Sequence, residues 1–166
     1  YDVTGHRAQD FMLEHIAQVV GQYFQLKGYR AMFFPTTGLH PQMPGMTDRE
    51  IWEGPSQRWA ELYSPFRYTF APFSHRHAAV RAGLGEFGYN NIVLTKEFGP
   101  RQRFNSIITN AELVPDPLIT EPICLRDKCM ICLKACPTGA ITLRPHVDKN
   151  RIFIDTPAKT DASLCS

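Results

Sequence analysis

The sequence predicts a mixed α/β (α+β) fold in two parts, a larger sheet-and-helix domain over residues 1–117 and a small cysteine-rich module over residues 118–166. Apolar positions at helical spacing precede a short apolar strand pattern, which is the order expected of an α/β layer. Four of the five cysteines gather near the C-terminus. Residues 115–117, Pro-Asp-Pro, lie just before this region and are typical of a linker.

The first expected element is a long amphipathic helix that begins near Thr4 and ends at Gly28. Threonine is favoured at the start of a helix and glycine just past its end. Residues 31–34 then form a short apolar strand pattern that Pro35 ends. The apolar helix positions, which we expect to be packed, are Met12, Ile16, Val19, Val20 and Tyr23.

Residues 36–55 are rich in proline and glycine and predict irregular chain. A loop of this length in a compact domain is usually functional or mobile. Thr47 and Glu50 have the spacing of a capping box, so we expect a short helix inside the loop.

A second helix is expected over residues 75–84, with Ser74 as its N-cap. His75 and His77 stand at its start. Because side chains two residues apart point in different directions on a helix, a His-x-His metal pair is not expected there.

The next segment, residues 82–91, contains three glycines, which would let a large ligand approach the backbone. It is not a dinucleotide-binding fingerprint, because it follows a helix and precedes the apolar strand pattern of residues 92–94. Further on, Arg101 and Arg103 alternate ahead of a strand-like run over residues 106–109, so both can face one side of extended chain. They could hold a phosphate or carboxylate, and ordinary exposed loop arginines are the alternative.

The spacing of the cysteines is the most informative pattern in the chain. A C-x4-C-x2-C-x3-C-P run is formed by Cys124, Cys129, Cys132, Cys136 and Pro137. Closely spaced cysteines that end in Cys-Pro are typical ligands of a 4Fe-4S cluster. The common run begins C-x2-C, so Arg126 stands at the usual first-ligand position and we expect Cys124 to replace it across a longer loop. The last cysteine of such runs often serves a second cluster, so Cys136 is expected either to do so or to complete the first.

Structural zinc and disulfide bonds are the alternatives to an iron–sulfur cluster. Structural zinc prefers paired C-x2-C units separated by a longer loop. Disulfides fit poorly with an odd cysteine count and with no signal-like apolar stretch at the N-terminus. Cys165 stands apart from the run and is either a spare thiol or a further ligand.

Composition limits the possible functions. Hydrophobic residues make up 43% and charged residues 20%, as in a globular protein, and the net charge of +2 is too small to indicate nucleic-acid binding. Apolar runs stay short of the ~20 residues that a membrane span needs. We therefore expect no membrane span and a cytoplasmic location.

Several motifs in order resemble the cobalamin-dependent iron–sulfur reductases, the family of epoxyqueuosine reductase and the reductive dehalogenases. The resemblance covers about residues 70–141. It is carried by Arg81-Ala82-Gly83-Leu84-Gly85-Glu86, Asn90-Asn91, Phe98-Gly99-Pro100-Arg101-x-Arg103, Ile107-Ile108-Thr109-Asn110 and the Cys-Pro-Thr-Gly-Ala-Ile run that begins at Cys136.

The resemblance implies a nitroreductase-like domain that binds a corrinoid (cobalamin), with an appended ferredoxin-like module that carries one 4Fe-4S cluster or two. It implies an oxidoreductase that passes electrons from the cluster to the corrinoid and reduces a small organic substrate of the epoxide or organohalide type. The corrinoid would be contacted by residues of the glycine-rich turn, the helix before it and the arginine pair. These candidates are Arg76, Gly85, Gly88, Tyr89, Asn90, Asn91, Arg101 and Arg103.

The family pattern is incomplete in this chain. The proton-donating aspartate of epoxyqueuosine reductase is absent here, since Thr69 lies about where it should fall, so Tyr68 or His75 is expected to supply the proton. The family's second cysteine run is missing, so we expect a truncated member, incomplete at both ends. Cys165 is then expected to be a ligand whose companions lie beyond Ser166 or in a partner chain.

The resemblance also implies an electron-donor protein such as ferredoxin or flavodoxin as a partner, and a modified tRNA only if the substrate is that of epoxyqueuosine reductase. Two alternatives stay open. One is a ferredoxin-like electron-transfer subunit without an active site of its own, and the other is a structural metal-binding interaction module.

Overall fold

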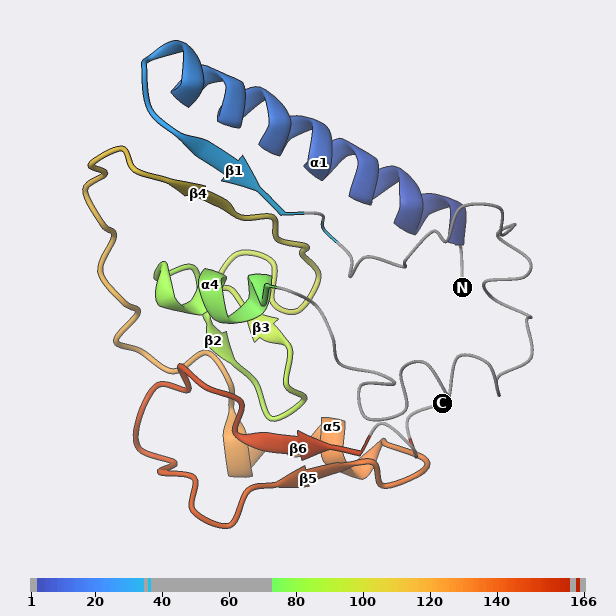
Figure 1. Ribbon diagram of the computed structural model, residues 1–166. Coiled ribbons are helices and arrows are strands. Elements are labelled where there is room, and N and C mark those ends of the chain that lie inside the picture. The colour runs from blue at the N-terminus through green and yellow to red at the C-terminus, as the bar shows by residue number, and fades with distance from the viewer. Residues whose placement is uncertain (1–2, 35, 37–72, 162–163, 165–166) are drawn as a thin grey trace, which may run out of the picture.

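The computed structural model describes residues 3–34, 36, 73–161 and 164, and the side chains from residue 8 onward. Within these ranges the chain is mixed α/β, with helices beside three two-stranded antiparallel sheets (Figure 1). The coarse fold class is therefore confirmed. The short helix expected near Thr47, together with Tyr68 and Cys165, lies outside the described residues.

The helix α1 (Val3–Leu26) and the strand β1 (Ala31–Phe33) form where the sequence predicts them. Gly28 ends the helix in a left-handed conformation, with φ of 86°. The N–H of Tyr29 donates to the carbonyl of Phe24 at 3.0 Å across this turn, as in a Schellman motif. The turn sends the chain back along the helix, where β1 pairs with β4 (Ile107–Thr109).

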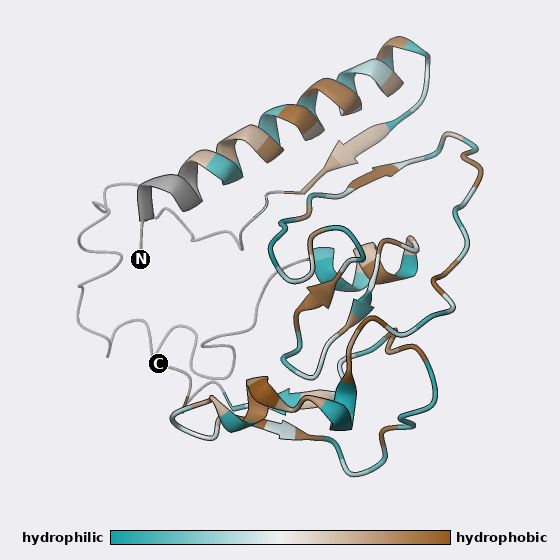
Figure 2. Ribbon diagram, turned by 180° about the vertical axis from the view of Figure 1, so that it is seen from behind, coloured by the Kyte–Doolittle hydropathy of each residue, from teal (hydrophilic) through white to brown (hydrophobic). Residues whose placement is uncertain are grey.

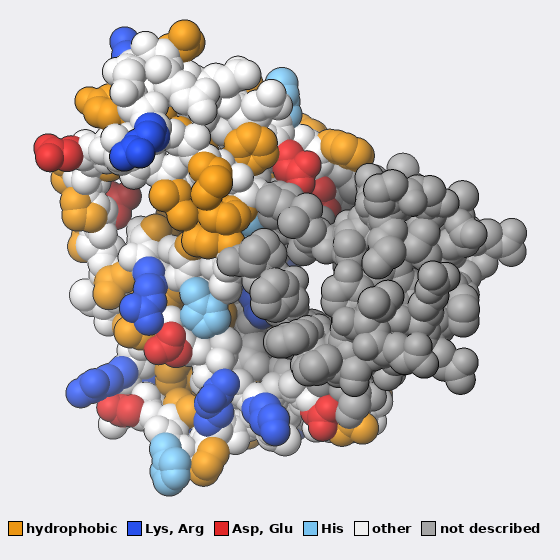
Figure 3. Space-filling view, viewed as in Figure 1, with side chains coloured by type: hydrophobic (Ala, Val, Ile, Leu, Met, Phe, Trp, Pro, Cys, Tyr) orange, Lys and Arg blue, Asp and Glu red, His pale blue; other side chains and the backbone are white. Residues whose placement is uncertain are grey.

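The face of α1 that packs inward is not the predicted one. Leu13, Ala17, Gly21 and Phe24 form the inward stripe, in which Ala17 and Gly21 are buried. The predicted positions, from Met12 to Tyr23, keep 39–65% exposure against the described part of the chain. Hydrophobic side chains accordingly lie on the surface around α1 and β1 (Figure 3). The helical period was right and its phase was wrong, because two neighbouring stripes of this helix are both apolar.

The middle of the chain supplies a short helix and a hairpin. The helix α4 (His75–Arg81) begins at the predicted N-cap, where the Ser74 side chain accepts from the N–H of His77, and it ends earlier than predicted. The glycine-rich segment contains β2 (Glu86–Phe87), which pairs with β3 (Val93–Leu94). The segment is thus half of a hairpin and not an open turn.

The C-terminal part begins with the cysteine loop, which contains the 3₁₀ turn η1 (Arg126–Lys128) and the short helix α5 (Ile131–Lys134). The strands β5 (Ile141–Leu143) and β6 (Ala158–Thr160) then pair with each other. Lys and Arg side chains alternate with acidic ones on this part of the surface (Figure 3). No helix in the described ranges combines the length and apolar character of a membrane crossing.

One apolar cluster joins the hairpin to the C-terminal part. Its buried members are Val80, Phe87, Tyr89, Val93 and Phe153. Cys124, Cys132, Leu133 and Leu143 pack against it. Hydrophobic residues are frequent in β3 and α5, while many residues of the connecting loops are hydrophilic (Figure 2). The contacts therefore cross residue 117, and the division of the chain into two domains at that residue stays a prediction.

Candidate metal centre

The cysteine loop is shaped by two residues with left-handed backbone. Arg126 has φ of 55° and Met130 has φ of 53°. The N–H groups of Cys129 and Met130 both donate to the carbonyl of Arg126, at 2.9 and 3.1 Å, and close the first turn. Met130 then starts α5. Left-handed residues other than glycine are uncommon, and here they reverse the chain twice within a few residues.

The thiols in the loop differ in their surroundings. Cys124, Cys129, Cys132 and Cys136 are all free and half-buried. Burial raises the pKa of the Cys132 thiol, and the nearby Cys124 and Cys129 raise that pKa further. Cys136 lies in a different setting, where a contact of 3.7 Å with the Thr138 hydroxyl lowers the pKa of the thiol. Cys136 thus lies in a different environment from Cys132.

This donor set fits an iron–sulfur cluster in its chemistry. Thiols are the ligands that such clusters require. The apolar cluster packs against Cys124 and Cys132 and limits water around their sulfurs. Across the described ranges, no three His, Cys, Asp or Glu side chains are already grouped as a metal site. The four thiols share one loop but are not gathered as a metal site in the described structure.

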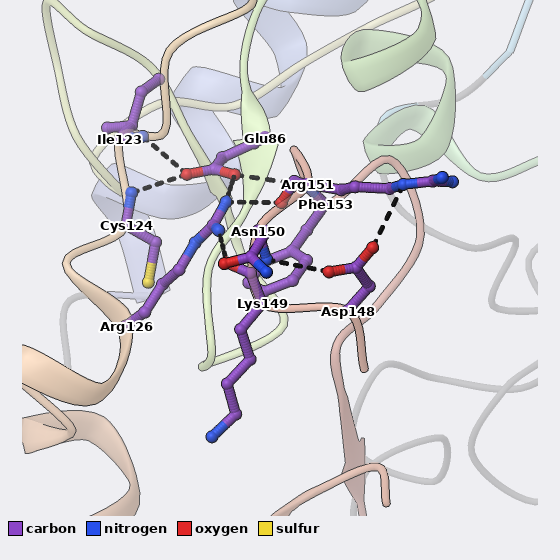
Figure 4. A network of polar contacts seen from close by, with 9 residues as sticks. All are labelled: Glu86, Ile123, Cys124, Arg126, Asp148, Lys149, Asn150, Arg151 and Phe153. Carbon is purple, nitrogen blue, oxygen red and sulfur yellow. Dashed lines mark hydrogen bonds and ion pairs between the residues drawn. The ribbon is translucent and has the colours of Figure 1, made fainter. Parts of the chain in front are cut away.

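A buried carboxylate, which the sequence analysis did not select, supports the loop from behind. Glu86 is completely buried at the start of β2. Its Oε1 accepts from the backbone N–H groups of Ile123 at 2.6 Å and Cys124 at 2.7 Å. Its Oε2 accepts from the N–H of Phe153 at 3.2 Å and from Arg126 Nη2 at 3.3 Å (Figure 4). Each carboxylate oxygen thus accepts two hydrogen bonds.

Arg126 completes this network. Its side chain is 12% exposed, and its guanidinium lies 4.3 Å from the centre of the Phe153 ring. Nη1 donates to the carbonyl of Lys149, and Nη2 donates to that of Arg151 at 2.6 Å. The Nε atom is buried without a hydrogen-bond partner within the described residues. Arg126 thereby ties the loop to residues 149–153.

Tyr89, which the resemblance implied as a corrinoid contact, is buried and points into the same region. Its ring stacks on Phe153, with ring centres 5.8 Å apart. Its hydroxyl donates to Asp127 at 3.0 Å, and Lys149 donates to the other oxygen of Asp127 at 2.8 Å. Burial, followed by the hydrogen bond to Asp127, raises the pKa of Tyr89 to about 12. The neutral phenol is therefore a fixed donor to the cysteine loop.

Asn91 makes a comparable link to the last strand. Its Nδ2 donates to the carbonyl of Ala158 at 3.0 Å and to the Thr160 hydroxyl at 2.9 Å, and its Oδ1 accepts from the N–H of Ala158 at 3.2 Å. Arg76 in turn donates to the carbonyl of Asn91 at 2.7 Å. The adjacent Asn90 accepts locally from the N–H of Ile92 at 3.1 Å. These contacts are internal to the fold.

Gly85 and Gly88 lack the Cβ atoms that would clash with Leu94 of the partner strand. A Cβ on Gly85 would lie 2.2 Å from the carbonyl oxygen of Leu94. A Cβ on Gly88 would lie 2.7 Å from the Asn90 side chain and 2.9 Å from that of Leu94. At these two positions the missing side chain serves hairpin packing, so the glycines do not offer an open cradle for a corrinoid.

The two arginines lie elsewhere, beside α1. Arg103 pairs with Asp10 of the helix at 2.8 Å. Arg101 is exposed and, with Met12, Ile16 and Ile92, lines a surface groove of about 740 Å³. The structure therefore divides the corrinoid candidates between the hairpin interior and this groove.

The catalytic candidates are placed only in part. His75 Nδ1 is 2.9 Å from the Ser106 hydroxyl, while His77 Nδ1 is 2.7 Å from the Ser74 hydroxyl. The two histidines thus face different partners, as the helical spacing predicts. Tyr68 and Cys165 are outside the described part of the chain.

Comparisons with known proteins give partial matches to two kinds of reductase. Tetrachloroethene reductive dehalogenase from Desulfitobacterium hafniense is 43% identical over 67 residues, which are 39% of this chain and 12% of that protein. The enzyme of the same name from Sulfurospirillum multivorans is 38% identical over 74 residues, 44% of this chain and 15% of that protein. Epoxyqueuosine reductase from Bacillus anthracis is 36% identical over 78 residues, 47% of this chain and 20% of that protein.

No family model matches the chain. The solved structure of epoxyqueuosine reductase from Streptococcus thermophilus aligns with a TM-score of 0.38 and 24% identity, over 68% of this chain and 35% of that one. The matches thus cover a fifth or less of the curated relatives' own length. Over part of its length, this chain is similar in sequence to reductive dehalogenases and epoxyqueuosine reductases, which confirms the resemblance that its motifs carry.

Proposed function

We propose that the cysteine loop holds a 4Fe-4S cluster through Cys124, Cys129 and Cys132, and that the chain is the electron-delivering part of a reductase. The observation that carries the proposal is the loop of four free, half-buried thiols, of which Cys124 and Cys132 pack against the apolar cluster. Similarity to two kinds of reductase supports a redox role over a purely structural zinc site. Cys136, which lies in a different setting, is the fourth ligand or the first ligand of a second cluster.

Residues of this chain would keep the ligands in place and keep water away. Phe153 and Tyr89 lie behind the loop in the apolar cluster. Burial and hydrogen bonding around the sulfurs are the means by which a protein sets the potential of a cluster. When bound, the cluster supplies electrons one at a time, which an electron-donor protein such as ferredoxin or flavodoxin must replace.

The substrate class follows from the two kinds of relative. An organohalide takes up two electrons and one proton as its carbon–halogen bond is replaced by a carbon–hydrogen bond and the halide leaves. An epoxide takes up two electrons and two protons to give an alkene and water. His75 or Tyr68 would hold the proton. His75 stands at the helix start with its ring nitrogen 2.9 Å from the Ser106 hydroxyl.

A corrinoid is implied by the resemblance, and the groove beside α1 is where this chain would contact it. Arg101 and Ile92 line that groove. An arginine there can bind an amide oxygen or a phosphate of a large cofactor. The buried Tyr89 and Asn91 do not fit this role, because their side chains are used inside the fold.

The close packing of Gly85 and Gly88 against Leu94 favours a second candidate function, an electron-transfer segment whose active site lies elsewhere. In that case the glycine turn is a tight connection. Such a segment would bind a cluster and no corrinoid.

Anaerobic purification followed by iron, sulfide and zinc analysis tests the cluster. We expect iron and sulfide in near-equal amounts and an electron paramagnetic resonance signal on reduction. Stoichiometric zinc without iron or sulfide would refute the cluster and leave the structural module. Titration of the iron-loaded protein with cobalamin, followed by calorimetry and absorbance, then distinguishes the two candidate functions, because the electron-transfer segment would bind no corrinoid. The titration should be repeated on the longest chain that can be prepared.

A further inference from the structure

Glu86 is an unusual group to find behind a loop of thiols. A carboxylate loses much of its hydration on burial, so a fully buried one needs charged or hydrogen-bonding partners on every side. Glu86 has them, since two backbone N–H groups meet one oxygen, and a backbone N–H and a guanidinium meet the other (Figure 4). Among residues 82–95 it is the only charged side chain.

Two of its four donors belong to the chain just before the cysteine loop. They are the N–H groups of Ile123 and Cys124, at 2.6 and 2.7 Å, which are short for hydrogen bonds of this type. The carboxylate therefore fixes the backbone from which the Cys124 side chain projects. The link joins positions 38 residues apart in sequence, so loop geometry alone does not produce it.

Arg126 occupies the usual first-ligand position of the cysteine run, and its side chain faces away from that role. Its guanidinium reaches the Glu86 carboxylate, the Phe153 ring and two carbonyls of residues 149–151. The left-handed φ of 55° at Arg126 gives the backbone its turn at this point. The loop is thus folded so that the Arg126 side chain points into the protein interior and makes contacts there.

We infer that the Glu86–Arg126 pair is a positioning device for the proposed cluster, which allows Cys124 to act as first ligand across the longer C-x4-C spacing. This inference rests on the proposed function. Glu86 anchors the backbone of Cys124, and Arg126 holds the loop turned and balances the charge. With a cluster bound, the pair would also place one buried negative and one buried positive charge behind the loop that holds it, and the potential of a cluster depends on such charges.

The sharpest test removes the anchor and keeps the packing. In the double variant Glu86→Leu with Arg126→Met, apolar side chains of similar size replace the pair, a change that buried ion pairs often tolerate. After anaerobic reconstitution we expect the iron content to fall at least twofold, toward that of Cys124→Ser, with a changed resonance spectrum of the reduced protein. Full iron content and an unchanged spectrum in a folded double variant would overturn the inference.

A single isosteric variant decides the case if the double variant does not fold. Glu86→Gln keeps an acceptor for the two N–H groups and removes the negative charge, so Arg126 is left uncompensated. We expect the reduction potential of the cluster to rise and its resonance to change. An unchanged potential together with an unchanged resonance would count against the device.

The control is Arg81→Gln, which removes an arginine from the exposed Arg81–Asp155 pair, whose side chains are 61% and 70% exposed. Iron content, spectrum and potential should match those of the unchanged protein. Failure of the proposed function is separately visible, because the unchanged protein would then hold no iron and sulfide. If the unchanged protein binds the cluster and Cys124→Ser keeps it intact, the function stands and the role of Cys124 as first ligand is refuted.

Discussion

Asn91 and Ala158 bind each other twice, because the side-chain amide of Asn91 donates to the carbonyl of Ala158 at 3.0 Å and accepts from its N–H at 3.2 Å. The amide thus takes the place of a neighbouring strand beside β6. Ala158 is 1% exposed, and its N–H donates to Asn91, while its carbonyl also accepts from Arg144 Nε at 3.4 Å.

Replacement of Asn91 by glycine should destabilise the protein by about 2–3 kcal/mol, since three hydrogen bonds are lost and the buried N–H of Ala158 loses its acceptor. Glycine keeps the left-handed backbone, for which φ is 59°. The free energy of unfolding in urea, followed by circular dichroism, measures the effect. Asn90→Gly is the control and should cost less than about 1 kcal/mol, because Asn90 makes a local contact. Equal losses in the two variants would contradict the assigned role.

Alanine at two glycines should have opposite effects. At Gly85 the added Cβ meets the Leu94 carbonyl at 2.2 Å, and backbone must move, so we expect a loss of about 2–3 kcal/mol. At Gly21, inside α1, nothing lies within 4 Å of the added Cβ, and the higher helix propensity of alanine should add about 0.5–1 kcal/mol. Thermal unfolding of the two variants side by side tests both signs.

Tyr89→Phe removes one hydroxyl and leaves the ring stacked on Phe153. With its pKa near 12, the phenol is neutral at pH 7 and its bond to Asp127 is present there. Loss of that bond should lower the unfolding free energy at pH 7 by about 1–2 kcal/mol. Tyr29→Phe, at a residue 44% exposed, is the control and should have little effect. A Tyr89→Phe protein as stable as its parent would show that water replaces the hydroxyl without loss.

Both arginines line the groove beside α1, and Arg103 is also paired with Asp10. Arg103→Gln breaks a half-buried pair with Asp10 and should lower stability by about 1–2 kcal/mol, between the values for exposed and buried pairs. Arg101→Gln should leave stability within about 0.5 kcal/mol and weaken cobalamin binding, if the groove is the corrinoid site. Calorimetric titration of both variants is the measurement. Unchanged cobalamin affinity in Arg101→Gln would remove the groove from the proposal.

Cys165→Ser tests whether Cys165 is a cluster ligand. Two all-cysteine cubes need about eight ligands, and the chain has five cysteines, so one complete cluster fits within it. If Cys165 is a ligand, its replacement lowers the iron content or changes the resonance of the reduced protein. Unchanged iron, sulfide and spectra would identify it as a spare thiol, with Cys136 or a non-cysteine group as the fourth ligand.

Local signals in the sequence were enough to predict several elements. Ser74 and Gly28 mark helix ends through contacts within a few residues, and both were placed correctly. The strand at residues 107–109 follows from its own apolar run. The cysteine spacing identified four of the thiols that the loop presents.

The parts that sequence could not give depend on contacts between distant residues. Glu86 meets Cys124 across 38 positions and Phe153 across 67, and nothing near Glu86 indicates either partner. Its isolation as the only charge among residues 82–95 was the available signal. Glycine in a turn is equally consistent with an approaching ligand and an approaching strand, and only the position of Leu94 distinguishes the two.

The cluster of Val80, Phe87, Tyr89, Val93 and Phe153 has a thermodynamic consequence. Because the hairpin and the cysteine loop share one interior, any group that binds the folded loop also shifts the opening equilibrium of the hairpin by mass action. Amide hydrogens of β2 and β3 should then exchange more slowly with solvent deuterium once iron is loaded, although no metal ligand lies on those strands. Binding of iron at the cysteine loop would thus slow amide hydrogen exchange in strands that lie some 40 residues earlier in the sequence.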